Sequence, residues 1–313
     1  MTTTPHAGRG ARPPSRGALR LSHLPQLLAA WPAYFLLKHL PLDLAERLAG
    51  WIGRGIGPRI GASRRAVRNL RLVFPAMPDA ETRRIVRAMW ENLARVPVDY
   101  IHLGRIFADP PRIEINGAEV LVRLKESGRG AILVSGHVGN WEMVTLAARR
   151  FGLRVVSVYR RFNNPVVDAY IHRLQAASGV EAVQKGAPGA RRMMAALAEG
   201  ATVVILADQR MNNGITVPFF GIPAMTAPAL ARLAFRFDVP VVPVRAERLA
   251  LARFKVTVEE PLDVPRTGDA ARDEAAMMAA VNARIEAWIR AKPEQWLWLH
   301  RRWPRDAKPA SGQ

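Results

Sequence analysis

The chain has 313 residues, of which 49% are hydrophobic, and its 46 lysines and arginines against 26 acidic residues give a formal net charge of +20. This length and composition can bury a substantial core, as one large domain or two modest ones. The excess positive charge indicates an anionic partner, such as nucleic acid, an anionic membrane surface, or an acidic protein or substrate. The absence of cysteine excludes disulfides, thiolate zinc sites and a cysteine nucleophile.

The N-terminal region predicts a tail followed by a membrane anchor. Residues 1–22 contain four arginines, no acidic residue and many small polar or proline residues, which predicts a disordered basic tail. The uncharged run Leu24–Leu37 is shorter than the roughly 20 residues that span a bilayer, and it contains Pro25 and Pro32. We therefore expect an interfacial or half-inserted helix over residues 23–41, with an ordinary buried helix as the alternative. No cleavage site of the usual form follows, which argues against a cleaved secretory signal.

Residues 42–110 show helical spacing throughout, with the last long helix predicted to break at Pro97. The glycine-rich stretch Trp51–Ile60 does not predict a nucleotide loop, because no strand precedes it. The basic stretch 54–71 contains no acidic residue. A solvated helix face is its default interpretation, but beside an apolar anchor it predicts contact with anionic lipid headgroups.

After Pro110–Pro111 the pattern changes to alternating strands and helices. This alternation predicts an α/β fold over residues 111–304, with a central mixed or mostly parallel sheet flanked by helices, and a disordered tail at 305–313. The predicted strands are Arg112–Asn116, Ala131–Ser135, Arg154–Tyr159, Thr202–Ala207, Val241–Arg245 and Arg253–Glu259. The predicted helices cover 118–125, 140–150, 165–178, 188–199, 226–237 and 272–291.

Polar side chains follow three of these strands directly. They are His137, the run Tyr159–Arg161, and the run Asp208–Arg210. Because function in such sheets gathers at the carboxyl ends of the strands, we expect these clusters to converge on one cleft.

His137 is the candidate for chemistry. It lies on a strand-to-helix turn, with Glu142 five residues later at the start of the helix, so the carboxylate can orient the imidazole as a base; the alternative is a histidine that only caps the helix. The chain has no Gly-x-Ser-x-Gly elbow, no His-Glu-x-x-His and no phosphate loop ending in Gly-Lys-Ser/Thr. A histidine without a nucleophile of its own suits general-base activation of a substrate hydroxyl. The seven histidines show no metal-ligand spacing, so neither a metal nor another cofactor is expected.

Four stretches, in order, resemble one family. Residues 136–142 resemble the His-x4-Asp/Glu box of glycerolipid-type acyltransferases, and more narrowly the late acyltransferases of lipid A biosynthesis, the lauroyl/myristoyl transferase family. Residues 159–173, residues 208–223 and the C-terminal block Pro293–Trp303 resemble the family's later motifs. Arg161 departs from the pattern, since the family usually has proline there.

The resemblance implies transfer of a fatty acyl group from acyl carrier protein to a hydroxyl of a lipid A precursor, at the cytoplasmic face of the bacterial inner membrane. His137 is then the general base and Glu142 its orienting carboxylate, with backbone N–H groups at the start of the 140–150 helix as oxyanion donors. The partners implied are the carrier protein, an anionic lipid acceptor and inner-membrane lipids, without nucleic acid. The candidate substrate-binding residues are Arg160, Asn164, Asp168, Arg173, Asp208, Gln209, Phe219, Phe220 and Gly221.

Several alternatives stay open at this point. The same chemistry fits a lysophospholipid, an aminolipid or a glycolipid such as a mannoside, and a non-enzymatic basic membrane- or nucleic-acid-binding protein is a third interpretation, although interleaved aromatic platforms are missing. Asp208 is either a substrate contact or a loop-capping carboxylate. Phe219 and Phe220 either wall an acyl-chain tunnel or form a packed turn. Arg301 and Arg302 are candidates to meet a carrier protein or a lipid phosphate.

Overall fold

The computed structural model describes residues 32, 34–159, 168, 173 and 179–310. Its centre is a seven-stranded sheet in the order β1-β9-β8-β2-β5-β3-β4, in which every pair of neighbours is parallel except β8 and β9. The α/β prediction with a mostly parallel sheet is therefore confirmed. The strands are β1 (Ile113–Asn116), β2 (Ala131–Ser135), β3 (Val155–Tyr159), β4 (Glu181–Gln184), β5 (Thr202–Leu206), β8 (Val241–Ala250) and β9 (Arg253–Val258).

Two parts of the sheet differ from the prediction. Strand β8 continues five residues beyond its predicted end at Arg245, because its second half pairs antiparallel with β9. Strand β4 and the separate hairpin β6 (Arg210–Phe219) and β7 (Ile222–Thr226) were not predicted. The first half of β6 is exposed and polar, so it lacks the alternation by which a half-buried strand is recognised.

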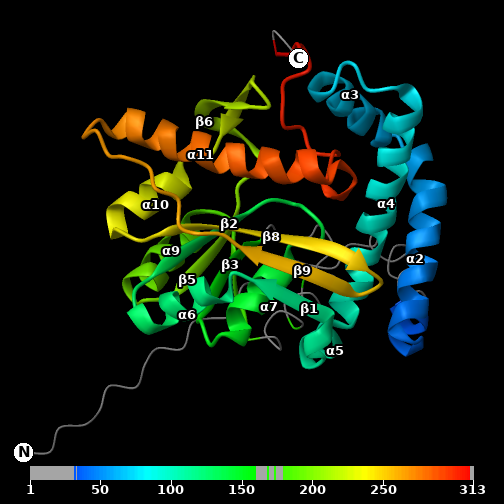
Figure 1. The fold of residues 1–313 in the computed structure, drawn as a ribbon, viewed down its shortest axis with the longest axis horizontal. Coiled ribbons are helices and arrows are strands. Elements are labelled where there is room, and N and C mark those ends of the chain that lie inside the picture. The colour runs from blue at the N-terminus through cyan, green and yellow to red at the C-terminus, as the bar shows by residue number, and fades with distance from the viewer. Residues whose placement is uncertain (1–31, 33, 160–167, 169–172, 174–178, 311–313) are drawn as a thin grey trace, which may run out of the picture.

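Helices cover both faces of the sheet (Figure 1). The helices α6 (Ala118–Ser127) and α7 (Glu142–Arg150) pack on one face, and α9 (Ala187–Ala198), α10 (Ala229–Phe237) and α11 (Ala270–Ala291) on the other. Successive residues of β5 serve the two layers, since Val203 faces the α9–α11 side and Val204 the α6–α7 side. This alternation is why the strands of a doubly covered sheet are apolar at almost every position.

The N-terminal helical region stands beside the sheet. It consists of α2 (Leu42–Ile56), the short η2 (Gly57–Arg59), α3 (Ser63–Val73), α4 (Asp79–Ile101), α5 (Leu103–Ala108) and the short η3 (Pro110–Arg112). Helices α2 and α4 lie side by side (Figure 1). Glycine allows the close approach, because a side chain at Gly53 would collide with the backbone of Trp90, and one at Gly57 with its indole ring. Gly53 and Gly57 therefore serve helix packing.

Helix α4 corrects one prediction, because it runs through Pro97 and ends at Ile101. A proline inside a helix removes one backbone N–H and weakens the helix locally. Here Val96, Val98 and Tyr100 are buried on either side of the proline, so tertiary packing maintains the helix beyond it.

The two ends of the chain are described only in part. Most of the predicted tail 1–22 and anchor 23–41 lies outside the described residues, although residues 34–39 are helical. None of the helices within the described ranges is both long enough and apolar enough to cross a membrane. At the other end, Ala307 and Ala310 pack against the core, and the disordered tail predicted at 305–313 stays a prediction.

Candidate active site

The register of two neighbouring strands brings His137 and Asp208 together. Strands β2 and β5 are adjacent and parallel, with Ser135 opposite Leu206. His137 and Asp208 each lie two residues beyond that pair, so the turns that leave the sheet place them next to each other. The predicted convergence is therefore confirmed for the clusters that contain His137 and Asp208.

Asp208 holds the imidazole of His137 from behind. Nδ1 of His137 lies 2.7 Å from Oδ1 of Asp208, and the backbone N–H of His137 donates to Oδ2 at 2.7 Å. The indole N–H of Trp296 donates to the same Oδ2 at 2.8 Å. Opposite an ionised carboxylate, Nδ1 carries the proton, which leaves Nε2 unprotonated and able to accept a hydrogen bond from the Gln209 amide.

The Asp208 carboxyl is fully buried and still favours its ionised form. Burial opposes ionisation, but the charge of His137 and its hydrogen bonds outweigh burial and hold the pKa of Asp208 below its ordinary value. Asp208 is therefore a standing negative charge behind the imidazole, which can stabilise the imidazolium that forms when Nε2 takes a proton.

The Nε2 side of His137 faces outward. The His137 side chain is 13% exposed, and the amide nitrogen of Gln209 lies 3.3 Å from Nε2. The Trp141 ring packs edge-on against the imidazole, with ring centroids 4.8 Å apart. A small cavity beside His137 is lined by Met89, Asn92, Leu93, Trp141, Gln295, Trp296 and Leu297.

A second histidine lies beside the first. The ring centroids of His300 and His137 are 4.7 Å apart, and Nε2 of His300 is buried without a hydrogen-bond partner in the described part of the chain. Burial, together with the charge of His137, lowers the pKa of His300 to about 4. His300 is therefore neutral at pH 7 and does not compete with His137 for the negative charge of Asp208.

The structure corrects the predicted partner of Nδ1, which is Asp208 and not Glu142. The physical reason is strand order: β5 lies next to β2, so the end of β5 brings Asp208 to the imidazole, whereas Glu142 is already the first residue of α7. Asp208 itself was predicted among the substrate-binding residues, but it is fully buried with both oxygens accepting N–H groups, so it acts on the histidine instead. Glu142 is buried close by, and its role stays a prediction.

Two of the backbone N–H groups predicted as oxyanion donors already have acceptors, and the prediction for the start of this helix stays a prediction. The N–H of Glu142 donates to Oδ1 of Asn140 at 3.1 Å, and that of Met143 to the Asn140 carbonyl at 3.1 Å. The first N–H groups of α7 are thus already bonded within the helix cap, as is usual for an asparagine just before a helix. The Gln209 amide is the donor group that the structure places nearest Nε2.

The other predicted site residues are described only in part. Arg160 and Asn164 lie outside the described residues, while Asp168 is buried and Arg173 exposed, both in helical conformation. Phe219 and Phe220 are fully buried and pack against Trp303 with centroids 5.6 and 6.3 Å apart. They precede Gly221 in the β6–β7 turn, where Phe220 and Gly221 both have positive φ. Of the two alternatives for Phe219 and Phe220, a tunnel wall or a packed turn, the structure has the packed turn.

Arg302 is not available to a partner. Its side chain is fully buried and donates to the Met225 carbonyl and the Thr226 hydroxyl, both at 2.8 Å. The prediction that it meets a carrier protein or a lipid phosphate is therefore wrong, whereas its neighbour Arg301 is exposed.

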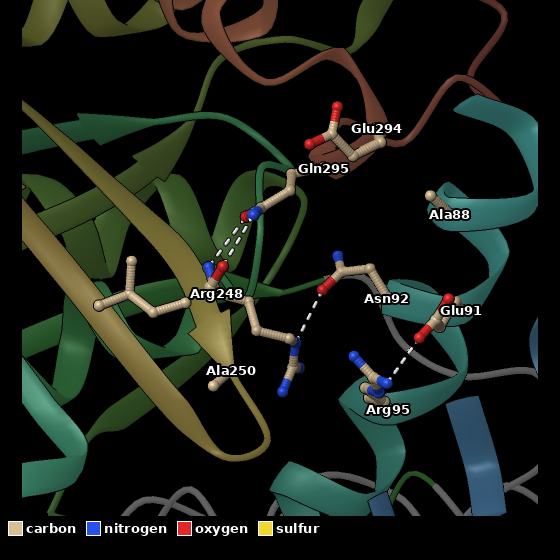
Figure 2. A pocket seen from close by; sticks show the side chains of 9 residues that line it. Ala88, Glu91, Asn92, Arg95, Arg248, Ala250, Glu294 and Gln295 are labelled. Carbon is tan, nitrogen blue, oxygen red and sulfur yellow. Dashed lines mark hydrogen bonds and ion pairs between the residues drawn. The ribbon is translucent and has the colours of Figure 1, made fainter. Parts of the chain in front are cut away.

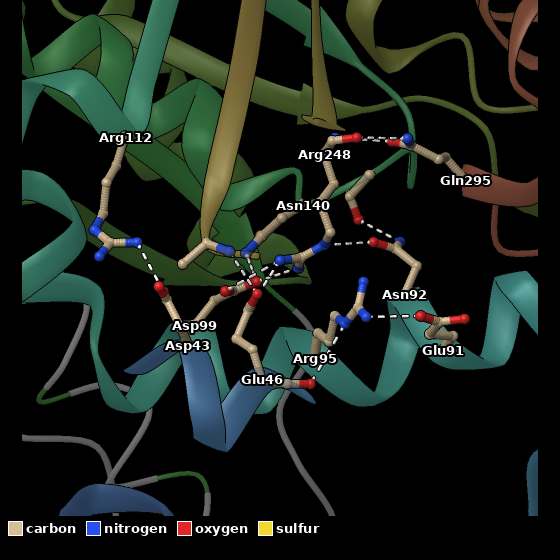
Figure 3. Close-up of polar contacts among 12 residues, drawn as sticks. Asp43, Glu46, Glu91, Asn92, Arg95, Asp99, Arg112, Asn140, Arg248 and Gln295 are labelled. Atoms are coloured by element: carbon tan, nitrogen blue, oxygen red, sulfur yellow. Dashed lines mark hydrogen bonds and ion pairs between the residues drawn. The ribbon is translucent and has the colours of Figure 1, made fainter. Parts of the chain in front are cut away.

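The turn that carries His137 is fixed on several sides. The Gly139 N–H donates to the Gln295 carbonyl at 2.9 Å, and the Asn92 amide donates to the Gly139 carbonyl at 2.9 Å. The Asn140 amide donates to Asp99 at 2.7 Å (Figure 3). Gly139 has a φ of +58°, and any side chain there would collide with the Ala246 carbonyl.

Arg248 is the centre of this support, which we call the clamp (Glu46, Asn92, Asp99, Asn140 and Arg248). The buried guanidinium pairs with Glu46 at 2.7 Å and with Asp99, and its Nε donates to Asn92 at 2.8 Å (Figure 3). Burial and the neighbouring Asp99 raise the pKa of Glu46 to about 9, despite the opposing charge of Arg248. Glu46 therefore keeps its proton at neutral pH, which leaves one buried positive and one buried negative charge.

A cavity of about 190 Å³ adjoins the clamp (Figure 2). Asn92 and Gln295 line both this cavity and the small one beside His137. The side chain of Gln295 accepts from the N–H and donates to the carbonyl of Arg248, each at 2.9 Å. Because both polar atoms of the Gln295 amide are bonded to the backbone of Arg248, this side chain is a fixed part of the lining of both cavities.

A metal ion is the other use that these side chains suggest, since one ligand atom each of His137, Asp208 and His300 lies within 4.8 Å of the others. The chemistry of the carboxylate argues against it. Both oxygens of Asp208 already accept N–H groups, and a cation there would have to displace the backbone N–H of His137 or the indole of Trp296. The donor set fits a carboxylate that holds a histidine.

Comparison with known proteins places the chain in a family. Residues 20–305 match the family described as "Bacterial lipid A biosynthesis acyltransferase". The chain is similar to the lipid A biosynthesis acyltransferase of Haemophilus influenzae, with 24% identity over 88% of this chain and 87% of the relative. It is similar to the lipid A biosynthesis lauroyltransferase of Escherichia coli, with 27% identity over 86% and 88% of the two chains. A solved 1-acyl-sn-glycerophosphate acyltransferase from Thermotoga maritima covers 82% of this chain at 14% identity with a TM-score of 0.39, below the level at which a shared fold follows.

Proposed function

Because the chain belongs to the bacterial lipid A biosynthesis acyltransferase family and is thus an acyl-transferring enzyme, we propose that it moves a fatty acyl group from acyl carrier protein to a hydroxyl of a lipid A precursor, with His137 as the general base. The observation that supports this mechanism is the hydrogen bond of 2.7 Å between Nδ1 of His137 and Asp208. It leaves Nε2 unprotonated on the outward side of the ring.

In the proposed reaction, Nε2 of His137 takes the proton of the acceptor hydroxyl as its oxygen attacks the thioester carbonyl. Asp208 stabilises the imidazolium that forms. The tetrahedral intermediate then collapses, the C–S bond breaks, and the imidazolium returns the proton to the leaving thiolate. Proton transfer of this kind contributes about 10²–10⁴-fold to the rate.

The oxyanion of the intermediate needs a hydrogen-bond donor. Gln209 supports this role, because its amide nitrogen lies 3.3 Å from Nε2, where the reacting atoms come together. Glu142 remains a proposed second carboxylate of the site, five residues after His137 at the first position of α7. The substrate-binding roles of Arg160, Asn164, Asp168 and Arg173 remain proposals of the same kind.

The donor assignment rests on charge. Acyl carrier proteins are acidic, and this chain has a formal net charge of +20. A positive surface speeds the encounter with an acidic partner, with a rate that falls as salt rises. The proposal therefore includes a salt-sensitive KM for the carrier-bound donor.

Membrane association is supported by the outer face of α2. Seven of the ten large hydrophobic side chains that are exposed in the described ranges lie between residues 35 and 60. On α2, one side packs Ala45, Ala49 and Gly53 against α4, while the other presents Trp51, 75% exposed. The seven exposed residues, which we call the apolar face, are Phe35, Leu36, Leu44, Trp51, Ile52, Ile56 and Ile60.

We propose that the apolar face lies in the anionic lipid of the cytoplasmic leaflet. The exposed Arg47 and Arg54 border it, which matches an interfacial helix with basic flanks and an aromatic residue near the headgroups. The measurement is flotation with vesicles that contain phosphatidylglycerol. Replacing Trp51, Ile52 and Ile56 by serine should lower vesicle binding at least about tenfold, since each loses about 1.5–3 kcal/mol of apolar burial. Val122→Ser with Leu249→Ser removes exposed apolar area elsewhere and should leave binding unchanged.

The activity is tested with purified protein, labelled acyl carrier protein and a tetra-acylated lipid A precursor. We expect a product with one added chain, and no product with His137→Ala at matched folding by circular dichroism. Acylation of a lysophospholipid, an aminolipid or a mannoside in place of the precursor would overturn the acceptor. Transfer from acyl-coenzyme A but not from the carrier protein would overturn the donor, and turnover by His137→Ala would overturn the general base.

A further inference from the structure

Helix α3 and the C-terminal segment bring four arginines together. Arg65 donates to the Leu299 carbonyl at 2.8 Å, and Arg68 donates to the Pro304 carbonyl at 3.1 Å. These contacts leave most N–H groups of both guanidinium groups unused. Arg301 and Arg305, which are exposed, lie on the segment to which α3 is attached. We call these four residues the arginine cluster.

The arginine cluster is not neutralised by the protein. Throughout the ranges that the structure describes, none of its four guanidinium groups forms an ion pair with a carboxylate, whereas Arg71 on the same helix pairs with Asp79 at 2.9 Å. Burial and the charges of Arg301, Arg68 and Arg305 lower the pKa of Arg65. Like charges held together by the backbone repel, and a bound anion removes the repulsion.

The arginine cluster adjoins the catalytic histidine. Arg65 donates to the carbonyl of Leu299, the residue before His300, and the ring centroids of His300 and His137 are 4.7 Å apart. Nε2 of His300, buried and without a partner in the described residues, is a further group that a ligand can satisfy. An anion bound at the arginine cluster would therefore lie on the same side of the molecule as His300 and His137, where one acceptor lipid can contact both.

The position favours a lipid over the carrier protein. Helix α3 follows directly on the apolar face, whose last exposed members are Ile56 and Ile60. Headgroup phosphates lie just outside the apolar layer of a leaflet, where Arg side chains bind them bidentately. This places the charged part of a lipid, and not a soluble donor, next to the arginine cluster.

We propose that Arg65, Arg68, Arg301 and Arg305 form a subsite for a phosphate monoester of the acceptor lipid, which fixes the acceptor while its hydroxyl meets His137. The proposal rests on the proposed function and adds the group by which the acceptor is recognised. Guanidinium groups on two elements can engage a phosphate dianion from two sides, so the subsite selects phosphorylated acceptors over neutral ones.

The test compares a phosphorylated acceptor with the same lipid after phosphatase treatment. The variant is Arg301→Gln with Arg305→Gln, because both side chains are exposed and neither donates a hydrogen bond to the backbone within the described residues. The control is Arg191→Gln with Arg272→Gln, which removes the same charge from exposed positions on α9 and α11. Arg301→Lys with Arg305→Lys keeps the charge and removes the bidentate geometry.

For the phosphorylated acceptor, we expect the Gln variant to raise KM about tenfold or more with kcat little changed, since a hydrogen bond to a charged group is worth about a factor of ten. The dephosphorylated acceptor should show the raised KM already with the wild-type protein, and no further change in the variant. The Lys variant should fall between, and the control should match the wild type.

Three results would overturn the subsite. One is an equal rise in KM for both acceptors in the Gln variant. Another is a raised KM for the carrier-bound donor alone, which would mean that the arginines bind a phosphate of the donor and not of the acceptor. The third is a control variant that loses as much as the cluster variant. If neither acceptor is acylated, the proposed function fails, and the subsite is judged separately by equilibrium binding of the phosphorylated lipid in detergent, which should still weaken about tenfold in the Gln variant.

Discussion

Buried carboxylates lie on two sides of the turn at residues 137–140, a single one at Asp208 and a pair in the clamp. The pKa is shifted down at Asp208 and up at Glu46 of the clamp. Asp208, behind His137, accepts three N–H groups and has a pKa below its ordinary value. In the clamp, Glu46 and Asp99 share the guanidinium of Arg248, and the pKa of Glu46 is raised to about 9. Both groups are almost inaccessible to water.

The difference follows from the group that lies beside each carboxylate. Asp208 lies against a histidine, whereas Glu46 and Asp99 lie beside each other and share one cation, so Glu46 keeps a proton and the buried charges balance. The Asp208 pair is thereby ready to stabilise a charge that appears during catalysis. The clamp has no net charge to offer and serves to hold the turn in place.

The largest effect is expected from Asp208→Asn. The amide retains the shape of the carboxyl but presents an N–H toward His137, which favours the wrong tautomer and removes the charge behind the imidazolium. We expect kcat to fall on the order of 10²–10⁴-fold with the fold retained, measured as product formed at saturating donor and acceptor.

Asp99→Asn is the matched control for that variant, because it changes a buried carboxylate of the clamp in the same way. Glu46 can then ionise and balance Arg248 alone, so we expect kcat to stay within about tenfold of the wild type. Equal losses of kcat in the two variants would contradict the distinction between the two carboxylate groups.

The second effect concerns stability. Arg248→Met leaves Asp99 and Glu46 without their cation and frees Asn92, and breaking a buried pair in this way costs about 3–5 kcal/mol of the free energy of unfolding. The measurement is urea unfolding followed by circular dichroism. Arg123→Met, which breaks the exposed pair with Glu260, should cost less than about 1 kcal/mol. A similar cost for both would show that the clamp is not a buried ionic group.

The sequence predicts most of the fold because the evidence is local. The apolar run Ala131–Ser135 and the helical spacing after it mark β2 and α7 without any knowledge of their neighbours. The strand-end positions also predict that His137 and Asp208 approach one another. The hairpin β6–β7 escapes prediction because its polar first half carries no periodic signal.

The sequence predicts that Asp208 approaches His137 but not that it is the partner of Nδ1, because that contact depends on strand order and on distant segments. Glu142 is near in sequence, but β5 lies next to β2 with β3 on its far side, and this order delivers Asp208. Arg248 lies beyond the predicted end of its strand, about 200 residues from Glu46. Trp296 and His300 had one signal, their place in the C-terminal motif, which names no contact.

The third effect distinguishes the two groups by pH. The pKa of Glu46 is about 9 when folded and 4.5 in its ordinary state, so the folded protein holds an extra proton between these values and loses stability as pH rises through that window. Asp208 has the opposite sign, since its stabilisation is present above its ordinary pKa and is lost only in strong acid. We expect Glu46→Gln to remove the decline, measured as the free energy of unfolding of variant minus wild type from pH 5 to 9.5. A difference that is flat in pH would contradict a protonated Glu46.

The smallest effect concerns Asn92, the residue that joins the clamp to the catalytic turn. Its amide donates to the Gly139 carbonyl at 2.9 Å and its oxygen accepts from Arg248 at 2.8 Å. We expect Asn92→Ala to cost about 1–3 kcal/mol of unfolding free energy, because two buried partners lose their hydrogen bonds.

If the clamp positions His137, Asn92→Ala should also lower kcat several-fold while KM for both substrates is kept. Asn282→Ala is the matched control, since Asn282 likewise links a carbonyl, that of Pro218, to an arginine, Arg302, but at the β6–β7 hairpin. It should lose comparable stability with kcat unchanged. In a double-mutant cycle, the kcat effects of Asn92→Ala and Asp208→Asn should be less than additive. The reason is that Asn92 affects the rate only by positioning His137, and Asp208→Asn has already disturbed that histidine. Full additivity would mean that Asn92 stabilises the protein without guiding the catalytic turn.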